Sequence, residues 1–243
     1  MLRCAVITID RRFRGPAASA NGGYACGVAA AQLSDAGGPV EVTLRSPPPL
    51  DSPIEVERAG ERAVFREGAQ LIAEAAVRTS LTIEPPAPVS FDEATQAARR
   101  CPWTAADAGH PYPGCFVCGP DRAEGDGLRI FPGAVTGRNV AAAPWIPDSS
   151  LAGADGRIRP EIVWSVLDCP SLFGMVCFEV WEGRPLLGRL AAEILSSPLV
   201  GDRCVCVGWF ERRDGRKFHA GSALFSERGE LRALGQATWI TVA

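Results

Sequence analysis

The chain has 243 residues and a net charge of −3, with 25 Lys and Arg against 28 Asp and Glu, and 47% of its residues are hydrophobic. This apolar content predicts a packed core and excludes an intrinsically disordered protein. Both signs of charge are mixed along the chain without a long basic run, which argues against a nucleic-acid-binding protein. No apolar stretch has the length of a membrane span or a signal-peptide core. We therefore expect a cytoplasmic protein whose nine cysteines are most simply small buried hydrophobic residues.

The first half of the chain predicts a strand, a helix and then a series of short strands. Residues 3–9 are strand-like, and the small apolar residues of 22–34 predict a helix that stops at the glycines and proline of 37–39. Four further strands, separated by turn residues, are expected at 40–44, 54–58, 63–66 and 69–77. One helix followed by antiparallel strands is an α+β layout in which the sheet wraps around the helix.

The second half of the chain repeats this order. Strands are expected at 127–131 and 139–143, followed by an apolar helix at 160–173 that opens with a proline. The remaining strands are expected at 186–195, 203–212, 217–226 and 231–242. Between the halves, residues 79–113 are rich in proline and contain one short helical piece near 92–100. The repeated order indicates an internal duplication, with domains at 1–80 and 114–243 and a linker at 81–113.

The helix at 22–34 begins with Asn21, Gly22, Gly23 and Tyr24. Two glycines there cost about 1 kcal/mol each relative to alanine, so some feature must favour bare backbone. Asn21 is the expected N-cap, and the free N–H groups and the helix dipole would stabilise a carbonyl oxygen that gains negative charge. The alternative is an ordinary capped helix whose glycines permit close packing. Tyr24 either lines a substrate pocket or packs in the core.

These residues resemble the hotdog superfamily, in the fused double-hotdog arrangement of acyl-CoA thioesterase II. In the single-domain thioesterases of phenylacetate pathways, His-Gly-Gly opens the central helix and an acid follows nine residues after the His. Here Asn21-Gly22-Gly23 keeps the glycines but has Ala30 at the place of the acid. Arg159-Pro160-Glu161 opens the second helix, and Asp168 stands nine residues after Arg159. The resemblance implies an α+β fold of two hotdog domains, with one complete site per chain.

That site would combine Gly22 and Gly23 as backbone donors with Asp168 as the base. Asp168 lies in an apolar helix, where an unpaired ionised carboxylate costs about several kcal/mol, and partial burial would raise its pKa. Two structural alternatives remain open, namely a cap on the turn before Pro170 or an ion pair with Arg159.

Gln236 is the third candidate, because residues 228–236 resemble the C-terminal strand on which thioesterase II enzymes carry a water-orienting Gln. The hydroxyl that this family carries on an earlier strand has no counterpart at 186–194. The alternative for Gln236 is a hydrogen-bonded core amide.

Other motifs indicate different kinds of site. Cys115 and Cys118 form a Cys-x-x-Cys pair that, with Cys101 and His110, would make a zinc site. A second Cys-x-x-Cys is missing, so we expect no metal and no cofactor. Cys169 is disfavoured as a nucleophile because no histidine motif would activate it. Three arginines before the glycine loop could meet coenzyme A phosphates or lie at a solvated edge: Arg11, Arg12 and Arg14.

The resemblance implies an acyl-CoA thioesterase that uses Asp168-activated water and binds acyl-CoA through Asn21, Gly22 and Tyr24. The alternative is a non-catalytic acyl-CoA-binding protein, favoured by the missing family His and Thr. A hydratase is disfavoured because its Asp–His pair has no evident histidine here. We also expect a homo-oligomer, because hotdog sheets leave an edge and a face open.

Overall fold

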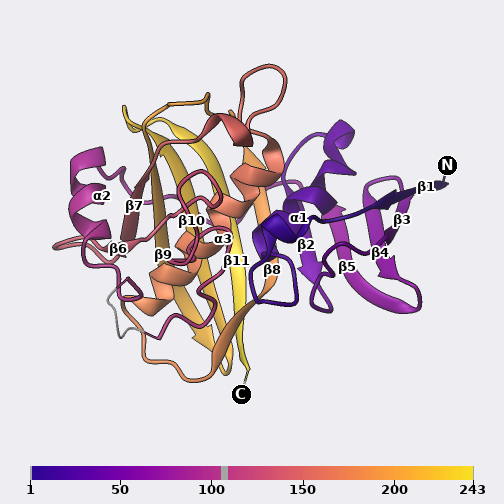
Figure 1. Ribbon diagram of the computed structural model, residues 1–243, viewed down its shortest axis with the longest axis horizontal. Helices are drawn as coiled ribbons and strands as arrows, with labels where there is room; N and C mark the ends of the chain where they lie inside the picture. The colour runs from indigo at the N-terminus through magenta and orange to yellow at the C-terminus, as the bar shows by residue number, and fades with distance from the viewer. Residues whose placement is uncertain (1, 105–108, 243) are drawn as a thin grey trace.

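The computed structural model describes residues 2–104 and 109–242, so residues 105–108 of the expected linker lie outside the described part. The described strands form one antiparallel sheet in the order β1-β3-β4-β5-β2-β8-β11-β10-β9-β7-β6 (Figure 1). The first half of the chain contributes β1 (Leu2–Ile7), β2 (Val40–Leu44), β3 (Ile54–Ala59), β4 (Arg62–Glu67) and β5 (Gln70–Val77). The second half contributes β6 (Gly133–Ala134), β7 (Ala141–Trp145), β8 (Arg184–Ile194), β9 (Cys204–Asp214), β10 (Lys217–Ser226) and β11 (Leu231–Val242).

The two halves of the sheet are joined by the pairing of β2 with β8. Val40 stands opposite Ala192 and Thr43 opposite Arg189, and the Arg189 guanidinium donates to the Thr43 hydroxyl at 3.0 Å. Backbone pairing therefore runs without a break from the β1 edge to the β6 edge.

Three α-helices accompany the sheet: α1 (Gly22–Ala31), α2 (Phe91–Ala98) and α3 (Pro160–Val176). Figure 1 shows α1 and α3 side by side across the middle of the sheet, with α2 at the end beside β6 and β7. The main core surrounds α1 and α3 and draws on both halves of the chain, and a smaller core lies under α2. Short 3₁₀ turns occur at Arg11–Phe13, Ser34–Ala36 and Ser149–Leu151. No helix in the described residues has the length and apolarity to cross a membrane.

Most of the expected elements are confirmed, with shifted ends. The first helix stops at Ala31, and the later one continues through Pro170 to Val176. The expected strand at 127–131 is wrong. Arg129 has a φ of 52°, which breaks an extended strand, and the N–H groups of Leu128 and Ile130 bond to the carbonyls of Phe116 and Val117 instead of to the sheet.

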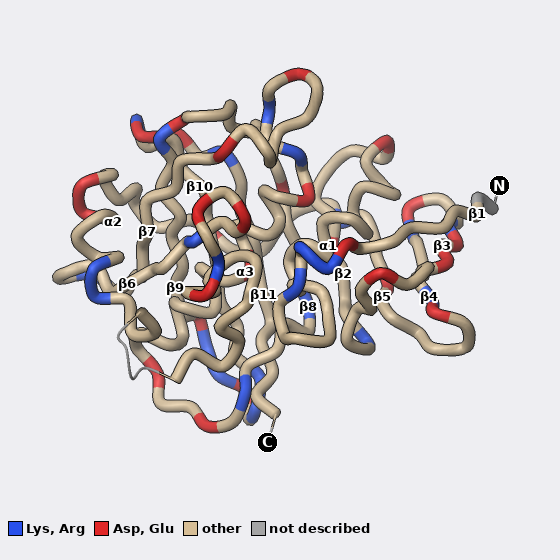
Figure 2. Tube along the Cα trace, viewed as in Figure 1, with Lys and Arg blue, Asp and Glu red and all other residues tan. Residues whose placement is uncertain are grey.

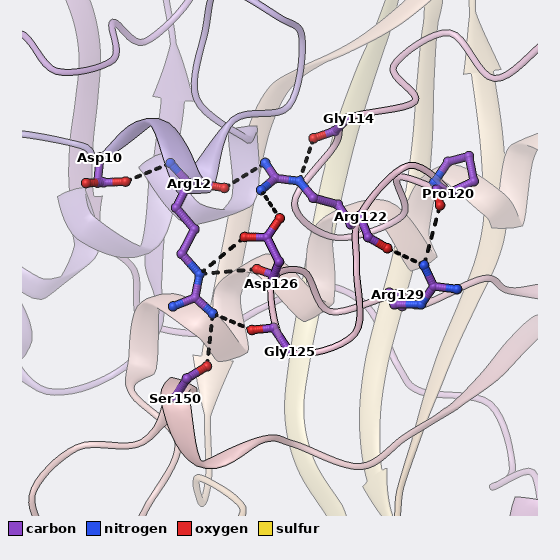
Figure 3. A network of polar contacts seen from close by, with 9 residues as sticks. All are labelled: Asp10, Arg12, Gly114, Pro120, Arg122, Gly125, Asp126, Arg129 and Ser150. Carbon is purple, nitrogen blue, oxygen red and sulfur yellow. Dashed lines mark hydrogen bonds and ion pairs between the residues drawn. The ribbon is translucent and has the colours of Figure 1, made fainter.

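Charged residues gather in the loops and at the sheet edges rather than along α3 (Figure 2). One of these loop residues, Arg122, is buried and fixes the loop that precedes residue 130 (Figure 3). The Arg122 side chain is 4% exposed, and it donates to the carbonyls of Gly114 at 2.8 Å and Arg12 at 2.7 Å and to the Asp126 carboxylate at 2.8 Å. Arg12 itself donates to the carbonyl of Gly125 at 3.1 Å. This network ties the loop to the first half of the chain.

Replacing Arg122 by methionine is expected to lower the free energy of unfolding by about 2–4 kcal/mol, because two carbonyls and a carboxylate lose their buried donor. Urea unfolding followed by circular dichroism measures this loss. Arg11→Met is the control, since the side chains of Arg11 and its partner Asp51 are 62% and 47% exposed and such pairs contribute at most about 1 kcal/mol. Equal losses in the two variants would contradict a special role for Arg122.

Candidate active site

Asp168 lies in the middle of α3, and its side chain reaches the amino end of α1. Its Oδ2 accepts hydrogen bonds from Asn21 Nδ2 at 2.7 Å and from the Gly23 N–H at 2.9 Å. The expected meeting of the early glycine pair with the late acid is therefore confirmed. Both structural alternatives for Asp168 are wrong, because α3 continues through Pro170 and Arg159 lies 3.6 Å from Glu161 instead.

Small residues in α1 allow this approach. A Cβ on Gly23 would lie 2.4 Å from Asp168 Cβ and 2.8 Å from the Trp164 carbonyl, and one on Gly27 would lie 2.6 Å from Glu161 Cα. The close-packing alternative for the glycines is thus also correct, since the same absence of a side chain lets the Gly23 N–H reach Asp168.

Asn21 has two functions at the start of α1. Its Oδ1 accepts from the Tyr24 N–H at 2.9 Å, which confirms the expected N-cap. Its amide nitrogen donates to Asp168 and also lies 3.8 Å from Cys115 Sγ. Asn21 therefore links the helix end, the carboxylate and a thiol in one buried group.

Asp168 is buried, with 1% of the residue exposed. Burial raises the pKa of Asp168 to about 7, although the hydrogen bond from Gly23 and the one from Asn21 favour the ionised form. Asp168 Oδ1 is buried and has no hydrogen-bond partner in the described structure. A buried carboxylate oxygen without a hydrogen-bond partner destabilises the folded state, unless a ligand or a water molecule donates to it.

A cavity of about 620 Å³ opens beside this carboxylate. Its volume suits a small-molecule ligand. Its walls include Asn21, Gly22 and Asp168, together with apolar side chains from the linker, α3 and the sheet, among them Trp103, Leu172, Leu187, Trp239 and Ile240. Three arginines lie along it, Arg45, Arg184 and Arg216.

Three buried cysteines complete the wall next to Asp168: Cys115, Cys118 and Cys169. Their sulfur atoms lie within 4.8 Å of one another, and Cys115 Sγ is 3.9 Å from Cys169 Sγ. Hydrogen bonds from the thiols of Cys118 and Cys169 hold the pKa of Cys115 well below its usual value. Sequence reasoning paired Cys115 and Cys118 with Cys101, whereas the fold brings Cys169 to them. The only sequence signal for this was the position of Cys169 directly after the buried acid.

No family model and no curated protein sequence matches the chain. Solved structures do resemble it over nearly its whole length. The tesB protein of Mycobacterium avium subspecies paratuberculosis has a TM-score of 0.64 at 14% identity and covers 99% of this chain and 93% of its own. A candidate thioesterase II from Thermobifida fusca has a TM-score of 0.64 at 13% identity, with coverages of 99% and 94%. A conserved protein with a hot dog fold from Alicyclobacillus acidocaldarius has a TM-score of 0.55 at 10% identity, with coverages of 99% and 94%. The chain has the hotdog fold.

Two expected site residues lie elsewhere in this hotdog fold. Gln236 is not among the residues that line the cavity, and its side-chain amide bonds with the Thr82 hydroxyl at 3.1 Å. On β11, Trp239 faces α3 and donates to Ser171 at 2.8 Å, so Gln236, three positions away, points to the opposite face of the sheet. Tyr24 stacks on Phe13 with ring centroids 3.8 Å apart, and burial raises its pKa to about 12.

Arg11, Arg12 and Arg14 are not among the residues that line the cavity, and the alternative of a solvated edge holds for Arg11, whose side chain is 62% exposed. Arg11 pairs with Asp51 at 3.0 Å, and Arg12 belongs to the Arg122 network of Figure 3. Among the described residues, the guanidinium groups along the cavity come from later segments, at Arg45, Arg184 and Arg216.

Proposed function

We propose that this protein is an acyl-CoA thioesterase made of two fused hotdog domains, residues 1–80 and 114–243, joined by a linker at 81–113. The observation that carries the proposal is the buried Asp168, with one oxygen held by Asn21 and Gly23 and the other unpartnered beside the cavity. The names of two structural neighbours, a tesB protein and a candidate thioesterase II, support this activity.

In the proposed reaction, Asp168 Oδ1 accepts a proton from a water molecule whose oxygen attacks the thioester carbonyl carbon. The carbonyl oxygen then carries negative charge, which a backbone N–H at a helix N-terminus stabilises. Gly22 is our candidate donor, because it lines the cavity and its N–H has no acceptor among the described residues. Gly23 holds Asp168 rather than the substrate. The carbon–sulfur bond breaks, and the departing coenzyme A sulfur takes up the proton from Asp168.

The test is hydrolysis of a panel of acyl-CoAs by the full-length protein. Mass spectrometry should follow free coenzyme A and the free acid, since the nine cysteines would react with thiol reagents. Turnover of at least one thioester is the expected result. Intact thioesters across aliphatic and aromatic acyl groups would contradict the proposal.

We propose that arginines along the cavity bind the phosphates of coenzyme A. Arg45 pairs with Glu74 at 2.6 Å, whereas Arg184 and Arg216 are exposed and form no ion pair among the described residues. Replacing both by alanine is expected to raise KM for acyl-CoA about tenfold, because two exposed charge contacts contribute about 1.4 kcal/mol together. Kinetics with the corresponding acyl-pantetheine, which lacks the nucleotide phosphates, should be unchanged. An equal rise for both substrates would mean that these arginines act on the acyl portion or on folding.

A non-catalytic acyl-CoA-binding protein is the second candidate. The observation in its favour is that Gln236 is turned away from Asp168 and that the Gly23 N–H is already engaged. Calorimetry with recovery of the ligand separates the two candidates, because a binder returns the thioester intact.

We further propose that the protein is a cytoplasmic homo-oligomer. The edge strand β1 pairs on one side only among the described strands, and it carries Val6, which is exposed. Light scattering on the purified protein tests the oligomeric state.

A further inference from the structure

We propose that Cys115, Cys118 and Cys169 together bind one soft divalent metal ion, Zn²⁺ being the probe of choice. The proposal concerns a site beside Asp168 and stands whether or not the protein hydrolyses thioesters.

The spacing of the three sulfur atoms suits this ion. In a tetrahedral zinc–thiolate site the Zn–S distance is about 2.3 Å, so bound sulfurs lie about 3.8 Å apart. Cys115 Sγ and Cys169 Sγ are 3.9 Å apart, and no pair in the cluster exceeds 4.8 Å. Small rotations of the side chains would therefore close the set around one ion.

The backbone around the first two cysteines is already organised as a tight turn. The Gly119 N–H donates to the Cys115 carbonyl at 2.9 Å, and the Cys115 N–H donates to the Tyr112 carbonyl at 2.9 Å. A Cβ on Gly119 would lie 2.5 Å from the Cys115 backbone, so only glycine fits there. Arg122 fixes the same turn through the Gly114 carbonyl. The cluster thus needs no folding of a loose loop on metal binding.

Cys169 comes from α3, 51 positions after Cys118 along the chain, and the helix holds it rigidly. A Cys-x-x-Cys turn facing a third thiol from a helix is a chelating arrangement. The other buried cysteines, such as Cys26 and Cys206, belong to no such group in the described residues.

His110 is the obvious fourth ligand from sequence, but its hydrogen bonding argues against it. Its Nδ1 accepts from the Tyr112 N–H at 2.9 Å, so the neutral ring carries its proton on Nε2, where it cannot bind a metal. The three cysteines would then leave a fourth position for an exchangeable ligand. All three line the cavity, as does Asp168, so that position adjoins the space proposed for the substrate.

Two polar groups support a ligand at this point. Asp168 Oδ1 is buried and unpartnered, which calls for a donor such as a water molecule. The Asn21 amide lies 3.8 Å from Cys115 Sγ and 2.7 Å from Asp168 Oδ2, so it is placed to donate to a thiolate in this cluster. Amide donors of this kind orient metal ligands from the second layer of a site.

Cobalt titration of the metal-free, reduced, full-length protein tests the proposal. We expect one Co²⁺ per chain, with intense thiolate-to-cobalt charge-transfer absorption that Zn²⁺ abolishes by displacement. Cys115→Ser, Cys118→Ser and Cys169→Ser should each weaken binding by at least about tenfold. Cys206→Ala is the matched control, because Cys206 is equally buried but lies in β9. Its spectrum and stoichiometry should equal those of the wild type.

A second measurement needs no variant and guards against variants that fail to fold. Zn²⁺ should protect Cys115, Cys118 and Cys169 of the wild-type protein from alkylation under partly denaturing conditions, while the reactivity of exposed Cys4 stays unchanged. Absence of a thiolate–cobalt band, a stoichiometry far below one, or equal protection of every cysteine would overturn the proposal. So would a disulfide within the cluster after anaerobic purification.

Discussion

Replacing Asp168 by asparagine is expected to reduce kcat for acyl-CoA hydrolysis by about 10²–10⁴-fold, the usual contribution of a general base. The amide has the shape of the carboxylate, so it still fits against Gly23, and its oxygen can take the place of Oδ2 and accept both present hydrogen bonds. It cannot take a proton from water. The free energy of unfolding should not fall greatly, because the substitution removes a charge from a buried site.

Steady-state kinetics by mass spectrometry and urea unfolding measure both effects. Glu161→Gln is the control on the same helix, since it also removes one carboxylate but lies in the first turn of α3, beside Arg159. Its kinetics should match the wild type. Full activity in Asp168→Asn would show that Asp168 is not the base and would leave it as a structural cap of α1.

Replacing Gly23 by alanine is expected to destabilise the fold and also to lower activity at least tenfold. Alanine in a helix is intrinsically better than glycine by about 1 kcal/mol, so propensity alone predicts a gain in stability. The added Cβ would lie 2.4 Å from Asp168 Cβ, and separating α1 from α3 to make room costs about 1–3 kcal/mol. That movement also pulls the Gly23 N–H away from the carboxylate.

Gly27→Ala is the matched control for this substitution. Gly27 lies one turn further along α1, and its added Cβ would meet Glu161 and Trp164 rather than Asp168. We expect a similar loss of stability in urea but a smaller loss of kcat per folded molecule. Equal losses of kcat in the two variants would mean that the distance between α1 and α3 matters in general and that the Gly23 contact is not special.

Much of the fold follows from local patterns in the sequence. The Asn21 cap, the helices at α1 and α3 and the strands from β8 to β11 have turn residues and apolar periods that predict them, and the structure confirms them. The resemblance to the hotdog superfamily, and not any local pattern, implies that Gly23 and Asp168 meet, and they do so although 145 positions separate them.

The sequence does not predict features that depend on which face of a strand or loop meets its neighbours in the folded protein. Gln236 stands at the right position along β11, but the alternation of side chains turns it toward Thr82. The segment at 127–131 has the composition of a strand, but the backbone of Arg129 is left-handed. Hydrogen bonds to Phe116 and Val117 hold the segment against the loop that carries Cys115 and Cys118. Cys169 lies 3.9 Å from Cys115 because the tertiary fold packs the loop of Cys115, which Arg122 holds at the Gly114 carbonyl, against α3.

The pairing of β2 with β8 within one chain affects how the amino-acid sequence of this protein can evolve. In an assembly of identical subunits, one substitution alters every copy of a position at once. Here both halves of the sheet belong to one polypeptide, so a substitution at Asn21-Gly22-Gly23 or at Asp168 changes a single position in the sheet and its helices. One half of the sheet can therefore acquire new residues while the other half keeps its own.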